Sequence, residues 1–250
     1  MAPTRFFPII NSMKTPPELT TLSSEAYESV RRRILQGELP LGEAVSRRRI
    51  AAELGMSFLP VSEALMRLEL EGLLESRPRA GTRVRIPSRD DVQGHYIVRE
   101  ALETQAARLF AKLATPRERT ELKKLAARVD ALARKADRLH YLQLHERLHS
   151  RIAECARCPA LSHAIEQTHS LASTWLCVQG GGKLEKLDHP HEDLVNGLCD
   201  HDPDVAMEAM RLHVQTSLQR TMIRLDPYFQ LGHTSERKFI RKGRGKTLPS

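Results

Sequence analysis

Apolar residues recur at helical spacing through most of the chain, and the first third also holds a hairpin pattern. The spacing predicts helices from Ser24 to about Gln36, between Ser46 and Gly55, and between Leu59 and Gly72. Two short strands are predicted at 73–77 and 82–86, joined by a turn at 78–81. Helix, helix, turn, helix and hairpin, in this order, are typical of a winged helix-turn-helix.

The chain beyond a linker at 87–91 is helical almost throughout. One long helix is predicted from Val92 to Leu113. Five more helices are predicted to begin near Pro116, Arg138, Pro159, Pro190 and Pro203, the last ending near Leu225. The sequence therefore predicts a mainly α fold, in which an N-terminal winged helix-turn-helix precedes an all-α bundle of six to seven helices.

These patterns divide the chain into four segments. Residues 1–22 hold four prolines and no sustained periodicity, so we expect a flexible N-terminal arm. Residues 23–87 form the predicted winged helix-turn-helix, and residues 88–226 form the helical domain. Residues 227–250 are rich in lysine, arginine and glycine, which predicts a basic, flexible tail.

Composition and charge indicate the class of partner and the cellular compartment of the protein. The formal net charge of +8 favours a polyanionic partner, although charge alone supports only non-specific attraction. Four cysteines lie in the second half of the chain, with no signal peptide and no apolar run of membrane-spanning length. We therefore expect a cytoplasmic protein with free thiols and no membrane partner.

The predicted third helix is the candidate recognition helix. Side chains in the first turns of such a helix face base edges in the major groove of double-stranded DNA. The candidates here are Ser57, Phe58, Leu59, Ser62 and, further along, Arg67. Further candidates are Arg48 on the preceding helix and Arg79 and Arg83 on the hairpin, both elements that can reach phosphates. A single surface arginine is usually only solvated. Arginines at all three elements that could contact DNA, namely the recognition helix, the preceding helix and the hairpin, favour DNA binding.

The stretch from Tyr27 to Ile86 resembles the DNA-binding domain of the GntR family of bacterial regulators. The resemblance is carried by ILQGELPLG at 34–42, IAAELGMS at 50–57, EGL at 71–73 and shorter matches between and after them. It implies DNA contacts from Arg48, Ser57, Pro78 and Arg79. Family members usually have arginine where this chain has Phe58 and Ser62. Because Phe58 and Leu59 can pack on a thymine methyl group, we expect an operator that differs from the usual family half-site.

Four of the eleven histidines are predicted to face the interior of the helical domain. His145 and His149 are four residues apart, so they project from one face of their helix. His191 begins a later helix, and His213 lies in the middle of the last one. Buried imidazole nitrogens without partners are costly, so these residues form either a divalent metal site or unrelated polar contacts. Spacing alone leaves both open.

Residues 92–225 resemble the FCD domain of FadR-like GntR regulators, through VREALE at 98–103, LH at 148–149, HEDL at 191–194 and MRLH at 210–213. The resemblance implies effector binding, dimerisation and a divalent metal held by one aspartate and three histidines. It assigns the histidine roles to His149, His191 and His213, and His145 stands where the aspartate is expected. Imidazole in place of carboxylate favours Zn²⁺ or Ni²⁺.

A small carboxylate metabolite is the effector that such a metal site implies, because open coordination positions could accept its oxygens. Arg99 is the candidate second anchor for this carboxylate, unless it forms a structural ion pair with a nearby glutamate. We therefore expect a homodimeric transcription regulator, most commonly a repressor in this family, on a palindromic operator. Two alternatives are a regulator that senses the metal itself and a metal-dependent enzyme using Glu103 or Glu146 as acid or base.

Overall fold

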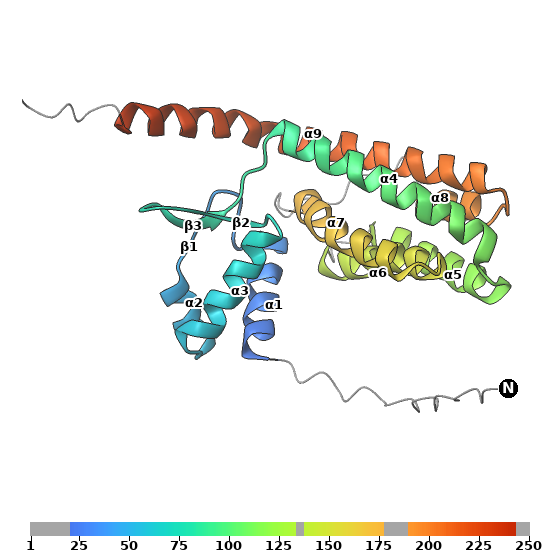
Figure 1. Cartoon of the computed structure of the whole chain (residues 1–250), viewed down its shortest axis with the longest axis horizontal. Coiled ribbons are helices and arrows are strands. Elements are labelled where there is room, and N and C mark those ends of the chain that lie inside the picture. The colour runs from blue at the N-terminus through green and yellow to red at the C-terminus, as the bar shows by residue number, and fades with distance from the viewer. Residues whose placement is uncertain (1–20, 134–137, 178–189, 244–250) are drawn as a thin grey trace, which may run out of the picture.

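The computed structural model of this protein describes residues 21–133, 138–177 and 190–243, and it has two lobes (Figure 1). The smaller lobe, the DNA-binding domain, consists of α1 (Leu22–Leu35), β1 (Ala44–Val45), α2 (Arg47–Leu54), α3 (Phe58–Leu70), β2 (Leu74–Arg77) and β3 (Gly81–Val84). The three strands form an antiparallel sheet in the order β1-β3-β2. The predicted winged helix-turn-helix is confirmed. Strand β1 was not predicted, because two residues are too few to show alternation.

Capping residues set where the helices of this domain begin and end. The side chain of Thr21 accepts a hydrogen bond from the backbone N–H of Ser24, so α1 starts slightly earlier than its apolar stripe predicts. Ser46 caps α2 in the same way, and Gly55 ends it in the left-handed conformation at φ 64°. The tight turn at Gly55 places α3 directly after α2, as a helix-turn-helix requires.

The larger lobe, the helical domain, contains six helices among the described residues. They are α4 (Arg89–Leu113), α5 (Pro116–Ala133), α6 (Arg138–Cys155), α7 (Pro159–Cys177), α8 (His191–Leu198) and α9 (Pro203–Gly243). A capping box between Ser88 and Asp91 starts α4, so the predicted linker at 87–91 is shorter than expected. The predicted glycine loop at 180–182 lies outside the described residues.

Helix α9 differs from the prediction of a flexible tail from residue 227. The helix continues through Pro227 and ends at Gly243. Proline inside a helix removes one backbone hydrogen bond, which is why the pattern predicted an end near Leu225. Arg89 on α4 contacts α9 on both sides of Pro227. It forms an ion pair with Asp226 and lies 4.7 Å above the ring of Phe229.

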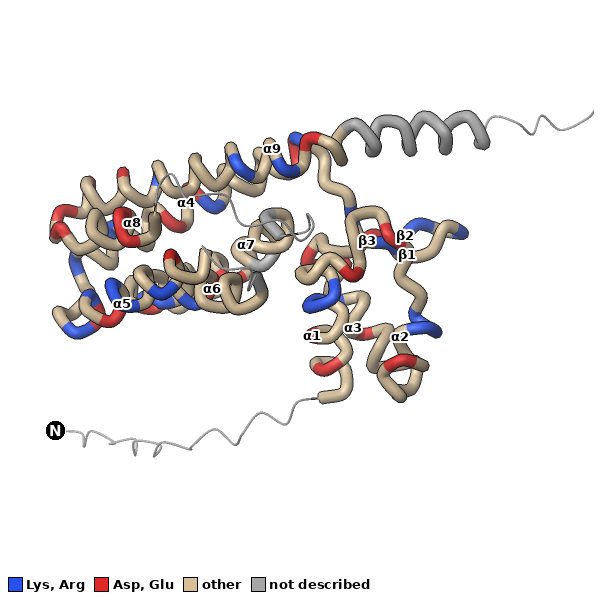
Figure 2. Tube along the Cα trace, turned by 180° about the vertical axis from the view of Figure 1, so that it is seen from behind, with Lys and Arg blue, Asp and Glu red and all other residues tan. Residues whose placement is uncertain are grey.

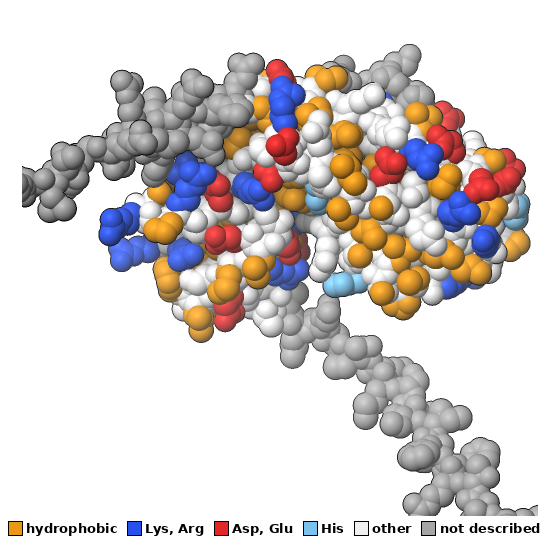
Figure 3. Space-filling model, turned by 45° about the horizontal axis from the view of Figure 1, so that its top comes forward, with side chains coloured by type: hydrophobic (Ala, Val, Ile, Leu, Met, Phe, Trp, Pro, Cys, Tyr) orange, Lys and Arg blue, Asp and Glu red, His pale blue; other side chains and the backbone are white. Residues whose placement is uncertain are grey.

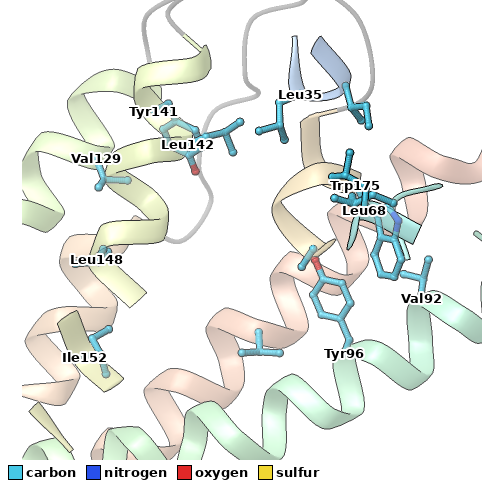
Figure 4. Close-up of a cluster of buried hydrophobic side chains, with 14 of the residues drawn as sticks. Leu35, Leu68, Val92, Tyr96, Val129, Tyr141, Leu142, Leu148, Ile152 and Trp175 are labelled. Carbon is cyan, nitrogen blue, oxygen red and sulfur yellow. The ribbon is translucent and has the colours of Figure 1, made fainter. Parts of the chain in front are cut away.

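One continuous cluster of buried apolar side chains runs through both lobes. Figure 4 shows Leu35 and Leu68 of the DNA-binding domain near Trp175 of the helical domain. The same cluster extends to Leu148 and Ile152 on α6. The two domains therefore share an apolar contact beside the chain that links them. Among the described residues, no helix has both the length and the apolar character needed to cross a bilayer.

Candidate DNA-binding surface and metal site

The first turn of α3 presents apolar side chains to solvent. Phe58 is 53% exposed and Leu59 is 68% exposed, although both belong to residue types that usually pack in a core. Ser57, the N-cap residue of α3, makes no side-chain capping bond and is exposed. Arg48 on α2 is exposed as well. An accessible helix N-terminus with apolar side chains has the shape and the chemistry to contact base edges.

Two other predicted DNA contacts on α3 already have partners within the domain. The hydroxyl of Ser62 donates to the carbonyl of Phe58 at 2.9 Å, which leaves only its lone pairs for another donor. Arg67 lies 3.1 Å from Glu71 and stacks over Tyr27 at 3.9 Å. Its guanidinium is directed toward α1, whereas Phe58 and Leu59 are exposed at the other end of the helix.

The hairpin of β2 and β3 forms the wing. Pro78 and Arg79 lie exposed at its tip, where Arg79 adopts φ 63°. Arg83 lies further back, 3.7 Å from Glu75. Figure 2 shows basic positions at the hairpin tip and at the start of α2. In Figure 3, Lys and Arg side chains gather at the end of the smaller lobe that lies away from the helical domain. This surface can meet a phosphate backbone on both sides of the recognition helix.

The structure brings the four predicted histidines together in the helical domain. His145 and His149 come from α6, His191 is the first residue of α8, and His213 comes from α9. One ring nitrogen from each lies within 4.8 Å of the other three. We call these four residues the histidine cluster. Two positions one turn apart on α6 and single positions on α8 and α9 therefore converge on one point.

The converging nitrogens are buried and have no hydrogen-bond partner among the described residues. They are Nδ1 of His145 and Nε2 of His149, His191 and His213. Burial lowers the pKa of His145 and His213 well below the ordinary value, and it lowers the pKa of His149 to about 3. Neighbouring histidines lower these values further. The rings of His145, His149 and His213 are therefore neutral near pH 7, and the unpartnered nitrogens of the cluster suit a divalent metal. The donor set fits the metal that the family resemblance implies.

Two carboxylates orient rings of the histidine cluster by contacting the ring nitrogen that lies away from the cluster centre. Glu103 lies 2.8 Å from Nδ1 of His149, and Asp130 lies 2.7 Å from Nδ1 of His191. Each carboxylate accepts the Nδ1–H, which leaves Nε2 unprotonated and directed into the cluster. Burial raises the pKa of Asp130, but hydrogen bonds and charge from His191, together with a backbone hydrogen bond from Glu192, lower it by more, so the group is ionised.

Arg99 forms the ion pair that was the alternative to an effector contact. The side chain is 1% exposed, and its Nε lies 2.8 Å from Glu103. His169 on α7 also contacts Glu103, at 3.1 Å, and no pattern in the sequence predicted this contact. Burial alone would raise the pKa of Glu103, but Arg99 and His169 hold it well below the ordinary value. Glu103, His149 and His169 could by themselves ligate a cation, yet the guanidinium of Arg99 supplies that positive charge.

The residues proposed for an enzyme have other partners. Glu146 lies next to His145 in the sequence, but its carboxylate lies 2.7 Å from Arg31 of the DNA-binding domain. Glu103 is occupied by Arg99 and His149. Neither carboxylate is free to act as an acid or base beside a metal. Fold and site together define a winged-helix transcription regulator with a histidine-lined site in its second domain.

Comparison with known proteins gives the family. The model of "Bacterial regulatory proteins, gntR family" matches residues 22–84, and the FCD domain model matches residues 95–216. The chain is 32% identical over 203 residues to a probable D-xylose utilization operon transcriptional repressor of Paenarthrobacter nicotinovorans, covering 81% of this chain and 89% of that protein. The chain belongs to the GntR family and carries an FCD domain. It is a transcription regulator, not an enzyme.

Further relatives and solved structures agree with this assignment. The repressor RspR of Escherichia coli strain K12 is 23% identical, over 78% of this chain and 86% of RspR. The structure of E. coli McbR/YncC covers 84% of this chain and 99% of its own, with a TM-score of 0.64 and 21% identity. A GntR regulator from Rhodococcus sp. RHA1 covers 80% of this chain and 97% of its own, with a TM-score of 0.65 and 18% identity. At such identities the two structures establish the fold.

Proposed function

We propose that this protein is a repressor whose affinity for its operator is controlled by a small carboxylate metabolite bound at or near a divalent metal. The observation that carries the proposal is the convergence of four buried, unpartnered imidazole nitrogens on one point. Buried imidazole nitrogens without a hydrogen-bond partner destabilise the folded state unless an ion or ligand binds them. An effector that prefers one placement of the DNA-binding domains changes operator affinity by its difference in affinity for the two states.

The histidine cluster would hold the metal, and an all-imidazole donor set favours Zn²⁺ or Ni²⁺. When bound, the metal supplies a Lewis-acidic centre that can accept a carboxylate oxygen. Glu103 and Asp130 orient His149 and His191 for this role. Arg99 is paired with Glu103, the carboxylate that orients His149, so it can be the second anchor only by exchanging that partner for the effector's carboxylate. An effector carboxylate reaching Arg99 would compete with Glu103 for its N–H groups.

The proposed operator contact uses apolar side chains on α3 and basic side chains around it. Phe58 and Leu59 would pack on thymine methyl groups, and Ser62 would accept a hydrogen bond beside them. Arg67 would contribute only after its guanidinium leaves Glu71 and Tyr27. Arg48 and Ser57 precede α3, and Pro78, Arg79 and Arg83 lie on the wing. We propose that these five residues contact phosphates or the neighbouring groove.

A homodimer on a palindromic operator is part of the same proposal. One winged helix covers only a half-site, and a twofold pair matches two half-sites. Repression is supported by the names of two relatives, which describe them as transcriptional repressors. Ile97 on α4 is 70% exposed and Val98 is 48% exposed, so an apolar face of the helical domain is open to a second copy.

The histidine cluster also favours a second candidate, a regulator that senses the metal itself. Four imidazole nitrogens can complete a tetrahedral site, which leaves no position open for an organic ligand. In that case metal affinity would lie near cellular free concentrations, and metal alone would change DNA affinity. A structural metal with an organic effector would instead bind tightly and need the metabolite for the change.

Metal analysis of the purified protein tests the site. We expect about one Zn²⁺ or Ni²⁺ per chain in the wild type and much less in His149→Ala and His213→Ala. His163→Ala is the control, because this histidine on α7 is exposed. Absence of bound metal at neutral pH after gentle purification, or loss of metal in the control as well, contradicts the site.

Binding-site selection with random duplexes tests the DNA-binding surface. We expect a half-site rich in thymine and distinct from the common family half-site, and Leu59→Ala should weaken specific binding by about tenfold. Leu70→Ala is the matched control, because Leu70 is 84% exposed at the far end of α3. A wild-type protein without preference for any duplex at moderate salt contradicts the DNA-binding proposal. Recovery of the common half-site contradicts the role of Phe58 and Leu59.

A further inference from the structure

We propose that the ion pair between Arg31 and Glu146 is a latch that transmits the state of the histidine cluster to the DNA-binding domain. Arg31 lies on α1 in the DNA-binding domain, and Glu146 lies on α6 in the helical domain. The inference deepens the proposed function, and it rests on that proposal where it involves a bound metal.

The contact is close and largely withdrawn from water. Nη2 of Arg31 lies 2.7 Å from Oε1 of Glu146, and the side chains are 16% and 28% exposed. The partners are 115 positions apart in the sequence, so only the packing of the two domains brings them together. An ion pair at this burial is screened less by solvent than an exposed one.

Glu146 shares its helix with half of the histidine cluster. It follows His145 directly and precedes His149 by three residues. Consecutive helical positions face different directions, so α6 presents His145 to the cluster and Glu146 to α1. Helices at allosteric interfaces typically shift by about 1–2 Å, which exceeds the range of distances that a hydrogen bond allows. When α6 moves, the DNA-binding domain must follow, or the Arg31 and Glu146 side chains must change rotamer or separate.

The latch borders a hollow between the two domains, which Figure 3 shows between the lobes. This cavity has a volume of about 690 Å³ and is lined by both domains. Its lining includes Tyr27, Arg31 and Arg67 on one side and His95, Thr168 and Leu171 on the other. Because this part of the boundary is not close-packed, the domains can reorient about the apolar contact that joins them.

The arrangement with the latch closed is also the one in which the metal site is assembled. The four cluster nitrogens already lie within 4.8 Å of one another. Closing the latch should therefore favour metal binding, and metal binding should by reciprocity favour the latched placement of α1. Breaking the pair from either side then weakens metal affinity.

Zn²⁺ affinity of the full chain, measured by competition with a chromophoric chelator, tests this coupling. We expect Arg31→Met and Glu146→Gln each to weaken Zn²⁺ binding by about fivefold, with no further loss in the double variant. The exchanged pair, Arg31→Glu with Glu146→Arg, should recover most of the loss. Glu154→Gln is the control, because it breaks an ion pair with Arg151 within α6.

Arg31→Met separates the latch from a direct charge effect. Removing a positive charge near the site would by itself strengthen cation binding, whereas loss of the latch weakens it. Unchanged or stronger Zn²⁺ binding in Arg31→Met overturns the proposal. If the wild type binds no Zn²⁺, the metal site of the proposed function fails, and small-angle scattering decides the latch alone. A larger radius of gyration in Arg31→Met and Glu146→Gln, but not Glu154→Gln, supports it, and equal radii overturn it.

Discussion

Glu103→Gln is the substitution that tests most directly how the histidine cluster is built. Glu103 lies on α4 and contacts Arg99 at 2.8 Å, His149 at 2.8 Å and His169 at 3.1 Å. Its side chain is 2% exposed. Glutamine keeps the shape and removes the charge, so the change isolates the electrostatic role of the carboxylate.

Stability should fall because the charge of Arg99 stays buried without its counter-ion. Arg99 is 1% exposed, and removing one partner of such a pair typically costs about 3–5 kcal/mol. For a chain of this size, that loss lowers Tm by roughly 6–20 °C. The exposed pair of Arg117 and Glu121 on α5 is the contrasting case, and Glu121→Gln should change Tm little.

Metal affinity should fall for a separate reason. Glu103 accepts the Nδ1–H of His149 and so keeps the lone pair of Nε2 directed into the cluster. A glutamine amide can donate to Nδ1 instead, which moves the ring proton to Nε2 and blocks the ligand atom. Loss of such an outer partner typically costs about 10- to 100-fold in metal affinity.

The double variant Arg99→Met/Glu103→Gln distinguishes the two effects. With neither charge buried, the free energy of unfolding should return to within about 1 kcal/mol of the wild type, since apolar replacement of buried pairs is often neutral. Zn²⁺ affinity should remain low, because His149 still lacks its acceptor. The measurements are thermal unfolding and chelator competition. Wild-type Tm and wild-type Zn²⁺ affinity in Glu103→Gln would refute the reasoning.

Three further predictions concern other parts of the molecule. Gly197→Ala should destabilise the fold by about 1–3 kcal/mol, because an added Cβ would lie 2.6 Å from Cβ of Ala209. In Gly94→Ala, the control, the added Cβ meets nothing within 4 Å, so this variant should be neutral or stabilising. Urea unfolding measures both changes. Zn²⁺ affinity should fall less than about tenfold from pH 7.0 to 5.5, because the lowered pKa values of His145, His149 and His213 keep these rings unprotonated; four ordinary imidazoles would lose more than about a thousandfold. Cys155 is fully buried and burial raises its pKa to about 11, so mass spectrometry should find it unmodified by iodoacetamide at pH 8 in the native protein, and rapid labelling would contradict this.

Local features explain which parts of the architecture were predictable. Helix α6 was predicted to begin near Arg138, and the structure gives Arg138–Cys155, because apolar residues recur at helical spacing through this segment. The i,i+4 spacing of His145 and His149 placed both on one face for the same reason. The end of α9 was predicted wrongly because contacts of Arg89 with Asp226 and Phe229 hold the helix across Pro227, and such contacts from α4 do not show in the local sequence.

The sequence by itself determined the periodicity of the helices, the order of the winged helix-turn-helix and the shared helix face of His145 and His149. These properties depend on neighbours three or four residues away, which backbone geometry relates directly. Only the tertiary structure decided that Asp130 orients His191 from 61 positions away and that Glu146 reaches Arg31 across the domain boundary. A charged side chain can pair with any opposite charge that packing brings near it, and no periodicity along the chain specifies which one.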